Sequence, residues 1–242
     1  MAGHGATDPA EHVPRHLRRP APTWLLLVGY LMVGLVVVSV LQGTRLVRVY
    51  NVPSGSMERT LGVGDRILVS GLPYLSAGPR RGDIVVFGHG DTWDDEAKPP
   101  TSDPLVAAAR VFGDVTGIGT ASRVHTVKRV IGLPGDTVEC CDTQGRVLVN
   151  GVPLDEPYVW RDLPFTASEH DCSTPARSAR CFEPLQVPEG RLLVLGDHRS
   201  NSADSVVECR APRAPASCGR FVEASRVVGV VFAKAWPPGP VG

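Results

Sequence analysis

An uncharged, strongly apolar run near the N-terminus constrains this chain more than any other feature. It extends from Trp24 to Leu41 and reads WLLLVGYLMVGLVVVSVL. A run of roughly 18 apolar residues is long enough to cross a bilayer as a helix. The alternative is a cleavable signal peptide, whose apolar part is shorter, about 7 to 15 residues, and ends at a small-x-small cleavage site. The chain continues Gln-Gly-Thr, a poor site of that kind, so the sequence favours a membrane anchor over residues 23–42.

The charges beside this run indicate its orientation. The preceding tail, residues 1–22, carries three arginines. Because positive charge accumulates on the cytosolic side of a membrane, this tail is expected in the cytosol. Two arginines after the run, Arg45 and Arg48, weaken the bias. We therefore expect a single-pass protein of the cell membrane, in contact with the lipid bilayer, whose remaining chain lies outside the cytoplasm.

The overall charge argues against one class of partner. Lysine plus arginine and aspartate plus glutamate number 25 each, so nothing indicates a nucleic-acid partner. Lysine is scarce, and Lys98, Lys128 and Lys234 are its only occurrences. Because arginine stays protonated in proteins, chemistry that needs a neutral amine would have to use one of these three.

All six cysteines follow the apolar run, which fits an oxidising compartment. The closely spaced pairs Cys172/Cys181 and Cys209/Cys218 are predicted to form local disulfides. Cys140 and Cys141 are then either a vicinal pair or two free thiols. A zinc site is the alternative, but no CxxC or HxxxH spacing supports it. We expect neither a metal nor a cofactor.

Short β-branched runs separated by Gly and Pro turns predict a mostly antiparallel β structure after residue 44. The predicted strands are Arg66 to Ser70, Asp83 to Phe87, Val124 to Leu133, Arg146 to Asn150, Arg191 to Leu195 and Val227 to Ala233. Leu-Pro-Gly-Asp at 133–136 and Asn150-Gly151 are typical turn sequences. The stretches His89 to Ser122 and Trp160 to Pro184 are predicted to be long surface excursions without an amphipathic helix.

Two serines stand close together just beyond the apolar run, in Val-Pro-Ser-Gly-Ser-Met at 52–57. Such a cluster is most often a plain loop. As a nucleophile, Ser56 would need a base, and neither a G-x-S-x-G elbow nor an S-x-x-K pattern accompanies it. A histidine base stays open at this point. The histidines after the apolar run are His89, His125, His170 and His198.

Lys128 interrupts the apolar run Val124 to Ile131. Burial there would lower its pKa. A lysine with a pKa of about 10.4 is protonated at pH 7, and a decrease of about three units needs about 4 kcal/mol of desolvation or repulsion. The alternative is an ordinary lysine on a solvent-facing strand edge.

A polar loop, GDHRSNSADS at residues 196–205, follows the strand predicted to end at Leu195. Alone, it reads as an exposed turn or a calcium-type loop. Together with the other clusters, however, it makes the chain similar to type I signal peptidases. PSGSMERTL resembles the family's P-S-x-S-M-x-P-T-L box, GDIVVF its G-D-I-V-V-F strand, VKRVIGLPGD its lysine box, and GDHRSNSADS its G-D-N-R-x-x-S-x-D-S box. The four boxes occur in the family's order, from the N-terminal anchor to about Ser205.

The resemblance implies a role for each matching residue. Ser56 would be the nucleophile and Lys128 its general base. The Ser54 side chain and the Ser56 amide would stabilise the oxyanion, and the Ser202 hydroxyl would orient the lysine amine. Residues expected to support that loop are Asp197, Arg199 and Asp204. Candidate walls of shallow apolar substrate pockets are Met57, Ile84 and Val86.

Three positions depart from the family pattern: Arg59 replaces a proline, His198 an asparagine, and Val206 a common arginine. The last departure removes the expected partner of Asp204, so Arg129 or Arg199 is expected to pair with it instead.

The resemblance implies a mostly β, two-part antiparallel extracytoplasmic domain over residues 43–236, preceded by the transmembrane helix. An inserted β region is expected over about 134–190, and residues 237–242 form a tail. The implied activity is removal of signal peptides from exported preproteins, with cleavage after small residues of Ala-x-Ala type. The alternatives are a specialised Ser/Lys peptidase for pilus or conjugation proteins, and a catalytically silent membrane-anchored binding module.

Overall fold

The computed structural model describes residues 23–43, 47–71, 78–89, 93, 101–116 and 125–241, without the side chains of 38–43 and 111–116. The chain divides into two compact units, Met1–Val38 and Ser39–Gly242.

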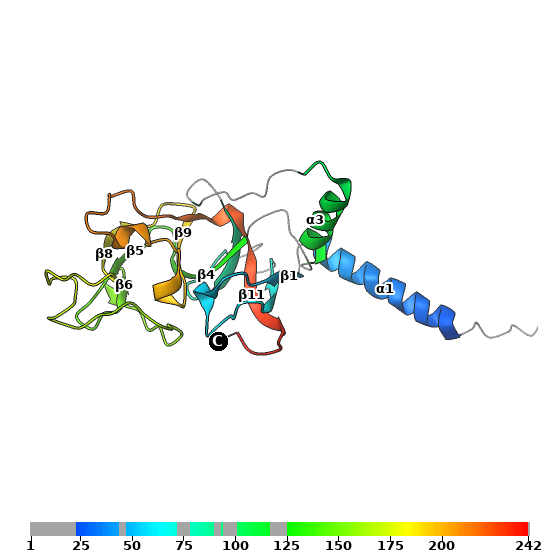
Figure 1. The fold of residues 1–242 in the computed structure, drawn as a ribbon, viewed down its shortest axis with the longest axis horizontal. Helices are drawn as coiled ribbons and strands as arrows, with labels where there is room; N and C mark the ends of the chain where they lie inside the picture. The colour runs from blue at the N-terminus through cyan, green and yellow to red at the C-terminus, as the bar shows by residue number, and fades with distance from the viewer. Residues whose placement is uncertain are drawn as a thin grey trace, which may run out of the picture. The chain divides into compact units, whose positions relative to one another are not determined.

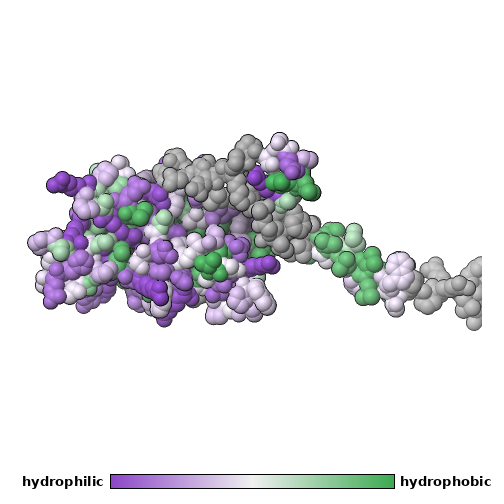
Figure 2. All heavy atoms as spheres, viewed as in Figure 1, coloured by the Kyte–Doolittle hydropathy of each residue, from purple (hydrophilic) through white to green (hydrophobic). Residues whose placement is uncertain are grey.

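Helix α1 (Thr23–Gly43) covers the apolar run near the N-terminus. Its side chains up to Val37 are all exposed, and most of them are apolar, as Figure 2 shows in green. In the part of the chain whose residues are described, no helix is both long enough and apolar enough to cross a membrane.

Two antiparallel sheets make up the second unit, which confirms the predicted mostly antiparallel β structure. The seven-stranded sheet has the order β1 (Val47–Asn51), β2 (Arg66–Ser70), β11 (Val227–Trp236), β3 (Ile84–Gly88), β4 (His125–Gly132), β9 (Arg191–Leu195) and β10 (Val222–Glu223). The four-stranded sheet has the order β7 (Val152–Pro153), β6 (Val147–Val149), β5 (Thr137–Cys140) and β8 (Phe182–Gln186). In Figure 1 the smaller sheet lies beyond β9, away from β1 and β11.

Four 3₁₀ helices and one further α-helix complete the described elements: η1 (Gly55–Met57), η2 (Arg199–Asn201), η3 (Glu208–Arg210), η4 (Ala224–Arg226) and α3 (Pro104–Thr116). The prediction of an excursion without a helix between His89 and Ser122 is therefore wrong. The Asp103 carboxylate accepts hydrogen bonds from the amides of Leu105 (2.8 Å) and Val106 (3.4 Å) and so caps α3. Proline follows at the first helical position, where its missing N–H costs nothing.

Several local predictions agree with the structure. Strands β2 and β9 have the predicted bounds. Asn150 and Gly151 have φ values of 54° and 75° and connect β6 to β7 as a tight hairpin. Strands β1, β5, β7, β8 and β10 were not among the strands predicted from the sequence.

The larger sheet buries both of its faces. Along β3, Ile84 and Val86 contribute to one apolar cluster, whereas Val85 and Phe87 contribute to the other. Burial on both sides explains why this strand reads as a continuous apolar run. A third cluster joins the smaller sheet to β4 and β9 through Ile131, Leu193 and Leu195. The two sheets therefore share a core at the strand that carries Lys128.

All six cysteines form disulfides: Cys172–Cys181, Cys209–Cys218 and the vicinal pair Cys140–Cys141. The two predicted local disulfides are confirmed, and the remaining cysteines form a pair rather than free thiols. The sulfurs of Cys141, Cys172 and Cys181 lie within 4.8 Å of one another. A zinc site there would require two disulfides to be reduced.

Candidate active site

Ser56 lies on a short turn that leads out of β1. Backbone hydrogen bonds between Val52 and Asp65 and between Gly64 and Val52, both 2.9 Å, close the segment 52–65 into a compact loop. The side chains of Met57 and Leu61 anchor it in the core. The 3₁₀ turn of η1 thereby holds Ser56 in place with only 6 % of the residue exposed.

Lys128 lies on β4, opposite Val85 of β3. Its Nζ is 2.6 Å from the Ser56 Oγ and 3.2 Å from the Val127 carbonyl oxygen. The structure thus brings together the two residues that the sequence paired, although 72 positions separate them.

The Lys128 amine is held in an environment that disfavours its charge. Burial lowers the pKa of Lys128 from 10.5 to about 8. The Asp204 and Asp197 carboxylates oppose this shift, whereas the positive charge of Arg220 reinforces it. Near pH 8 a large fraction of the amine is therefore neutral and able to accept a proton from Ser56.

The loop 196–205 packs directly on the turn Gly55–Met57 that carries Ser56. These two segments are called here, after the roles expected of their residues, the catalytic loop and the nucleophile turn. A Cβ atom on Gly196 would lie 2.3 Å from the Ser202 Oγ and 2.5 Å from the Ser56 carbonyl oxygen. Only glycine fits at that close approach. The His198 amide also donates to the Ser56 carbonyl oxygen at 3.1 Å. Ser202 Oγ is buried beside the nucleophile and has no hydrogen-bond partner among the residues described.

Asp197 connects the catalytic loop to two other segments. Its carboxylate accepts hydrogen bonds from Arg129 Nε and Nη2, at 2.8 and 2.7 Å, and from the Thr60 hydroxyl at 2.5 Å. Arg129 neighbours Lys128 on β4, and Thr60 follows the nucleophile turn. A single carboxylate therefore holds both parts of the Ser56–Lys128 pair against the loop.

The expected partners of Asp204 are wrong. Arg129 pairs with Asp197, and Arg199 pairs with Glu156. Arg210 on η3 lies 3.5 Å from the fully buried Asp204 carboxylate. The amides of Gly196 and Val206 also donate to Asp204, at 3.4 and 3.3 Å.

Two departures from the family pattern have visible local consequences. Arg59 has a φ of 77°, which the ring of proline forbids, and its guanidinium lies 5.6 Å from the centre of the Trp160 ring. His198 Nδ1 lies 3.1 Å from a Glu58 carboxylate oxygen and 3.2 Å from the Gly55 carbonyl oxygen. Because both neighbours are acceptors, Nδ1 carries the proton in the neutral ring.

An open cleft of about 410 Å³ gives access to the pair. Its lining residues are Ser54, Gly55, Ser56, His89, Trp93, Thr126, Lys128, Asn201, Ala203 and Arg220. The Ser54 hydroxyl is 3.4 Å from the Ser56 hydroxyl. The three candidate pocket walls do not line the cleft, because they are buried in the core beneath it: Met57, Ile84 and Val86.

The histidines contact other groups. His89 bonds to the Thr126 hydroxyl at 2.7 Å on the cleft wall. Among the described residues, Ser56 Oγ has hydrogen-bond partners only in Lys128 and Ser54. The geometry therefore fits lysine, rather than histidine, as the base for this serine.

Sequence reasoning gave no role to several residues that surround the site: Thr60, Glu156, Tyr158, Trp160, Arg210 and Arg220. Thr60 belongs to the first family box, so its position carried a signal. The residues of 156–160 and the two arginines carried none, because only the three-dimensional fold brings them to the catalytic loop.

Comparisons with known proteins extend these findings. Residues 24–236 match the family model described as signal peptidase, peptidase S26. A probable signal peptidase I from Mycobacterium leprae is 33 % identical over 96 % of this chain and 82 % of the relative. Signal peptidase I from Mycobacterium tuberculosis is 36 % identical over 81 % of this chain and 67 % of its own length. A solved signal peptidase I from Enterococcus faecalis is 29 % identical, covers 64 % of this chain and 97 % of that chain, and aligns with a TM-score of 0.33.

Proposed function

Because the chain belongs to the signal peptidase family, peptidase S26, and is thus a serine peptidase, we propose that it removes N-terminal signal peptides from exported preproteins. The proposed catalytic pair is Ser56 and Lys128. The observation that carries the proposal is the 2.6 Å separation of Ser56 Oγ and Lys128 Nζ at the floor of an open cleft. The depressed pKa of Lys128 supports the role of a neutral amine.

In the first half of the proposed reaction, Ser56 Oγ attacks the carbonyl carbon of the scissile bond while the neutral Lys128 amine takes its proton. The oxygen of the tetrahedral intermediate accepts hydrogen bonds from the Ser56 amide and the Ser54 hydroxyl. Ser54 is exposed on the cleft and next to the nucleophile, as this role requires.

The intermediate then collapses as the C–N bond breaks and the protonated Lys128 gives its proton to the leaving amine. The mature protein departs, and the signal peptide stays esterified to Ser56. Lys128, again neutral, takes a proton from water as that water attacks the ester. This second intermediate collapses as the C–Oγ bond breaks and the protonated Lys128 returns its proton to Ser56 Oγ, which releases the signal peptide with a free carboxyl group and restores both residues. Ser202 Oγ is buried and has no hydrogen-bond partner among the described residues, so its hydroxyl is free to turn toward the Lys128 amine, and we assign it the role of orienting that amine through this cycle.

The proposal includes attachment to the membrane through residues 23–42, with residues 1–22 in the cytosol and the peptidase domain (43–236) outside. The exposed apolar side chains all around α1 support it, because a helix with apolar side chains on all sides needs an apolar environment. Residues 134–190 form the proposed insert, which contains the whole smaller sheet. Resistance of the protein to alkaline extraction from membranes would support the anchor, and release into the soluble fraction would contradict it.

Cleavage of a purified preprotein with an Ala-x-Ala site tests the activity. We expect the detergent-solubilised protein to cut after the last alanine, as N-terminal sequencing of the product would show, and Ser56→Ala to be inactive. Replacing that last alanine by leucine should block the cut. A folded wild-type protein that leaves the preprotein intact would contradict the proposal.

A further inference from the structure

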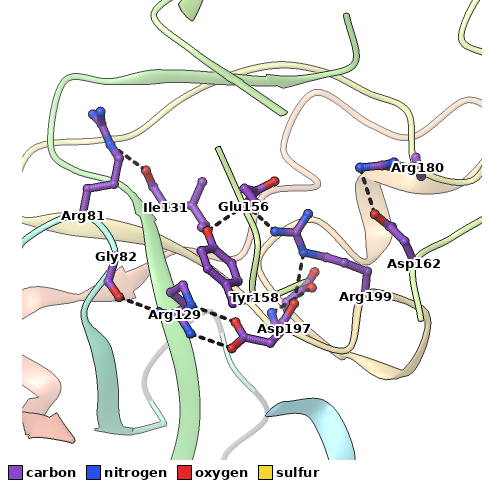
Figure 3. A network of polar contacts seen from close by, with 12 residues as sticks. Arg81, Gly82, Arg129, Ile131, Glu156, Tyr158, Asp162, Arg180, Asp197 and Arg199 are labelled. Atoms are coloured by element: carbon purple, nitrogen blue, oxygen red, sulfur yellow. Dashed lines mark hydrogen bonds and ion pairs between the residues drawn. The ribbon is translucent and has the colours of Figure 1, made fainter. Parts of the chain in front are cut away.

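A buried network connects the region of the smaller sheet to the catalytic loop (Figure 3). At its centre is Glu156, on the segment between β7 and β8, whose side chain is 7 % exposed. One of its carboxylate oxygens, Oε1, accepts hydrogen bonds from the Tyr158 hydroxyl at 2.9 Å and from Arg199 Nη2. This single oxygen thus has two donors, and each leads to a different part of the loop.

The first connection goes through Arg199. Its Nε donates to the Gly196 carbonyl oxygen at 3.1 Å while its Nη2 is held by Glu156. Gly196 is the residue whose position leaves no room for a Cβ atom between it and both the Ser202 hydroxyl and the Ser56 backbone. Glu156 therefore fixes, through one arginine, the point where the loop meets the nucleophile turn.

The second connection goes through Tyr158. Its ring lies 3.8 Å from the Arg129 guanidinium carbon, in a cation–π contact, and Arg129 in turn holds Asp197 with two hydrogen bonds. The Trp160 amide reaches the same residue and donates to the Asp197 carbonyl oxygen at 2.8 Å. Both connections thus end on adjacent residues, Gly196 and Asp197.

The charges in this network depend on one another. Burial disfavours the charge of Arg199, but Glu156, together with smaller contributions from Asp162 and Tyr158, more than offsets this and raises the pKa of the guanidinium. Removing one member of a buried ion pair leaves the other uncompensated, so the remaining group has to move or recruit water. Movement of Arg199 would release the Gly196 carbonyl from its only side-chain donor among the residues described.

From this geometry we infer that Glu156 is a positioning residue for the Ser56–Lys128 pair and acts through Arg199 and Tyr158. The inference rests on the proposed peptidase function and adds to it. Glu156 contacts neither Ser56 nor Lys128, so its effect is on their placement. A displacement of about 1 Å in such a site lowers the rate by about 100-fold.

The variant Glu156→Gln tests the inference, because it keeps the shape and the acceptor oxygen but removes the charge. We expect kcat for preprotein cleavage to fall about 10- to 100-fold while KM changes by less than about two-fold. Glu183→Gln is the matched control, since Glu183 forms a 2.8 Å ion pair with Arg177 but its side chain is 81 % exposed. This control should leave both constants unchanged.

A second readout needs no substrate. The chain has three lysines, so lysine-specific isotope labelling gives few NMR signals, and Lys128→Met assigns the one of interest. In Glu156→Gln the Lys128 signal should titrate at higher pH than in the wild type, because a loosened catalytic loop lets water reach the amine. This titration tests the positioning role even if no preprotein is cut, which separates it from the proposed function.

Tyr158→Phe is a second, milder variant that tests the inference if Glu156→Gln does not fold. It removes one hydroxyl and keeps the ring over Arg129. It should shift the Lys128 titration in the same direction by a smaller amount. The inference is overturned if a folded Glu156→Gln variant keeps the wild-type titration and kcat. It is equally overturned if only Tyr158→Phe folds and that variant titrates as the wild type does.

Discussion

The Thr60 hydroxyl donates a 2.5 Å hydrogen bond to the Asp197 carboxylate and so joins the nucleophile turn to the catalytic loop. Both groups are buried. The same carboxylate holds Arg129, the neighbour of Lys128, so Asp197 fixes the two halves of the pair relative to each other.

Replacing Thr60 by valine keeps the volume of the side chain and removes this bond. We expect the free energy of unfolding to fall by about 1–3 kcal/mol, since a buried carboxylate loses a donor. We also expect kcat to fall about 10-fold. Chemical denaturation and cleavage kinetics measure the two effects. Thr174→Val is the control. It removes a hydroxyl from a turn between β7 and β8, where that hydroxyl accepts a hydrogen bond from the Asp171 amide, and it should leave kcat unchanged. Equal kinetics for the two variants would contradict the role of Thr60.

The pKa of Lys128 predicts the pH dependence of cleavage. In the proposed mechanism only the neutral amine accepts the Ser56 proton, and burial lowers the pKa of Lys128 to about 8. The value of kcat/KM should therefore rise tenfold per pH unit below pH 8 and level off above it. A profile measured from pH 6 to 10 with a peptide substrate whose side chains do not titrate in this range tests the prediction. A kcat/KM that does not change over this range would contradict the prediction, because it would mean that no base with a pKa near 8 takes part in cleavage.

The same pKa predicts a stability cost. Unfolding restores the Lys128 pKa to about 10.5, so between pH 8 and 10.5 the unfolded state binds more protons than the folded state, and stability rises with pH. Below pH 8 the cost reaches its full value of about 3 kcal/mol. Lys128→Met should consequently be more stable than the wild type at pH 7, as denaturant titration would show. A variant less stable than the wild type would contradict this account of burial.

Ser202 and Ser205 give opposite predictions although both are buried serines. Ser202 Oγ has no hydrogen-bond partner among the described residues, whereas Ser205 Oγ accepts from the Val194 amide at 2.9 Å. Ser202→Ala should lower kcat by about 10-fold or more with little loss of stability. Ser205→Ala should cost about 1–3 kcal/mol of stability by leaving an amide unsatisfied. The reverse pattern in thermal melts and kinetics would contradict the assigned roles.

The sequence predicted the features that depend on neighbouring residues and missed most of those that depend on contacts between distant parts of the chain. Strands β2 and β9 and the Asn150-Gly151 turn depend on local preferences, and the sequence predicted them correctly. Asp103 and Pro104, a capping residue followed by a first-position proline, are local signals for α3 as well, although that helix was not predicted. The pairing of Ser56 with Lys128 came from the resemblance, since no local pattern links residues on a turn and a distant strand.

Interactions that depend on burial across the fold could not be predicted. Arg210 lies next to the Cys209–Cys218 disulfide, which the sequence did predict, but nothing in the order of residues shows that the Arg210 guanidinium lies beside Asp204. Glu156 is likewise an ordinary surface residue by sequence, and only the contact between the smaller sheet's region and the catalytic loop buries it.

The most direct test of the central claim is single-turnover cleavage of an Ala-x-Ala preprotein by wild type, Ser56→Ala and Lys128→Met. Both substituted residues lie at the 2.6 Å contact, and both variants are expected to fold. We predict cleavage by the wild type alone, with each variant slowed by at least about 10⁴-fold. Substantial cleavage by a folded Lys128→Met protein would show that another group takes the Ser56 proton and would contradict the Ser/Lys mechanism.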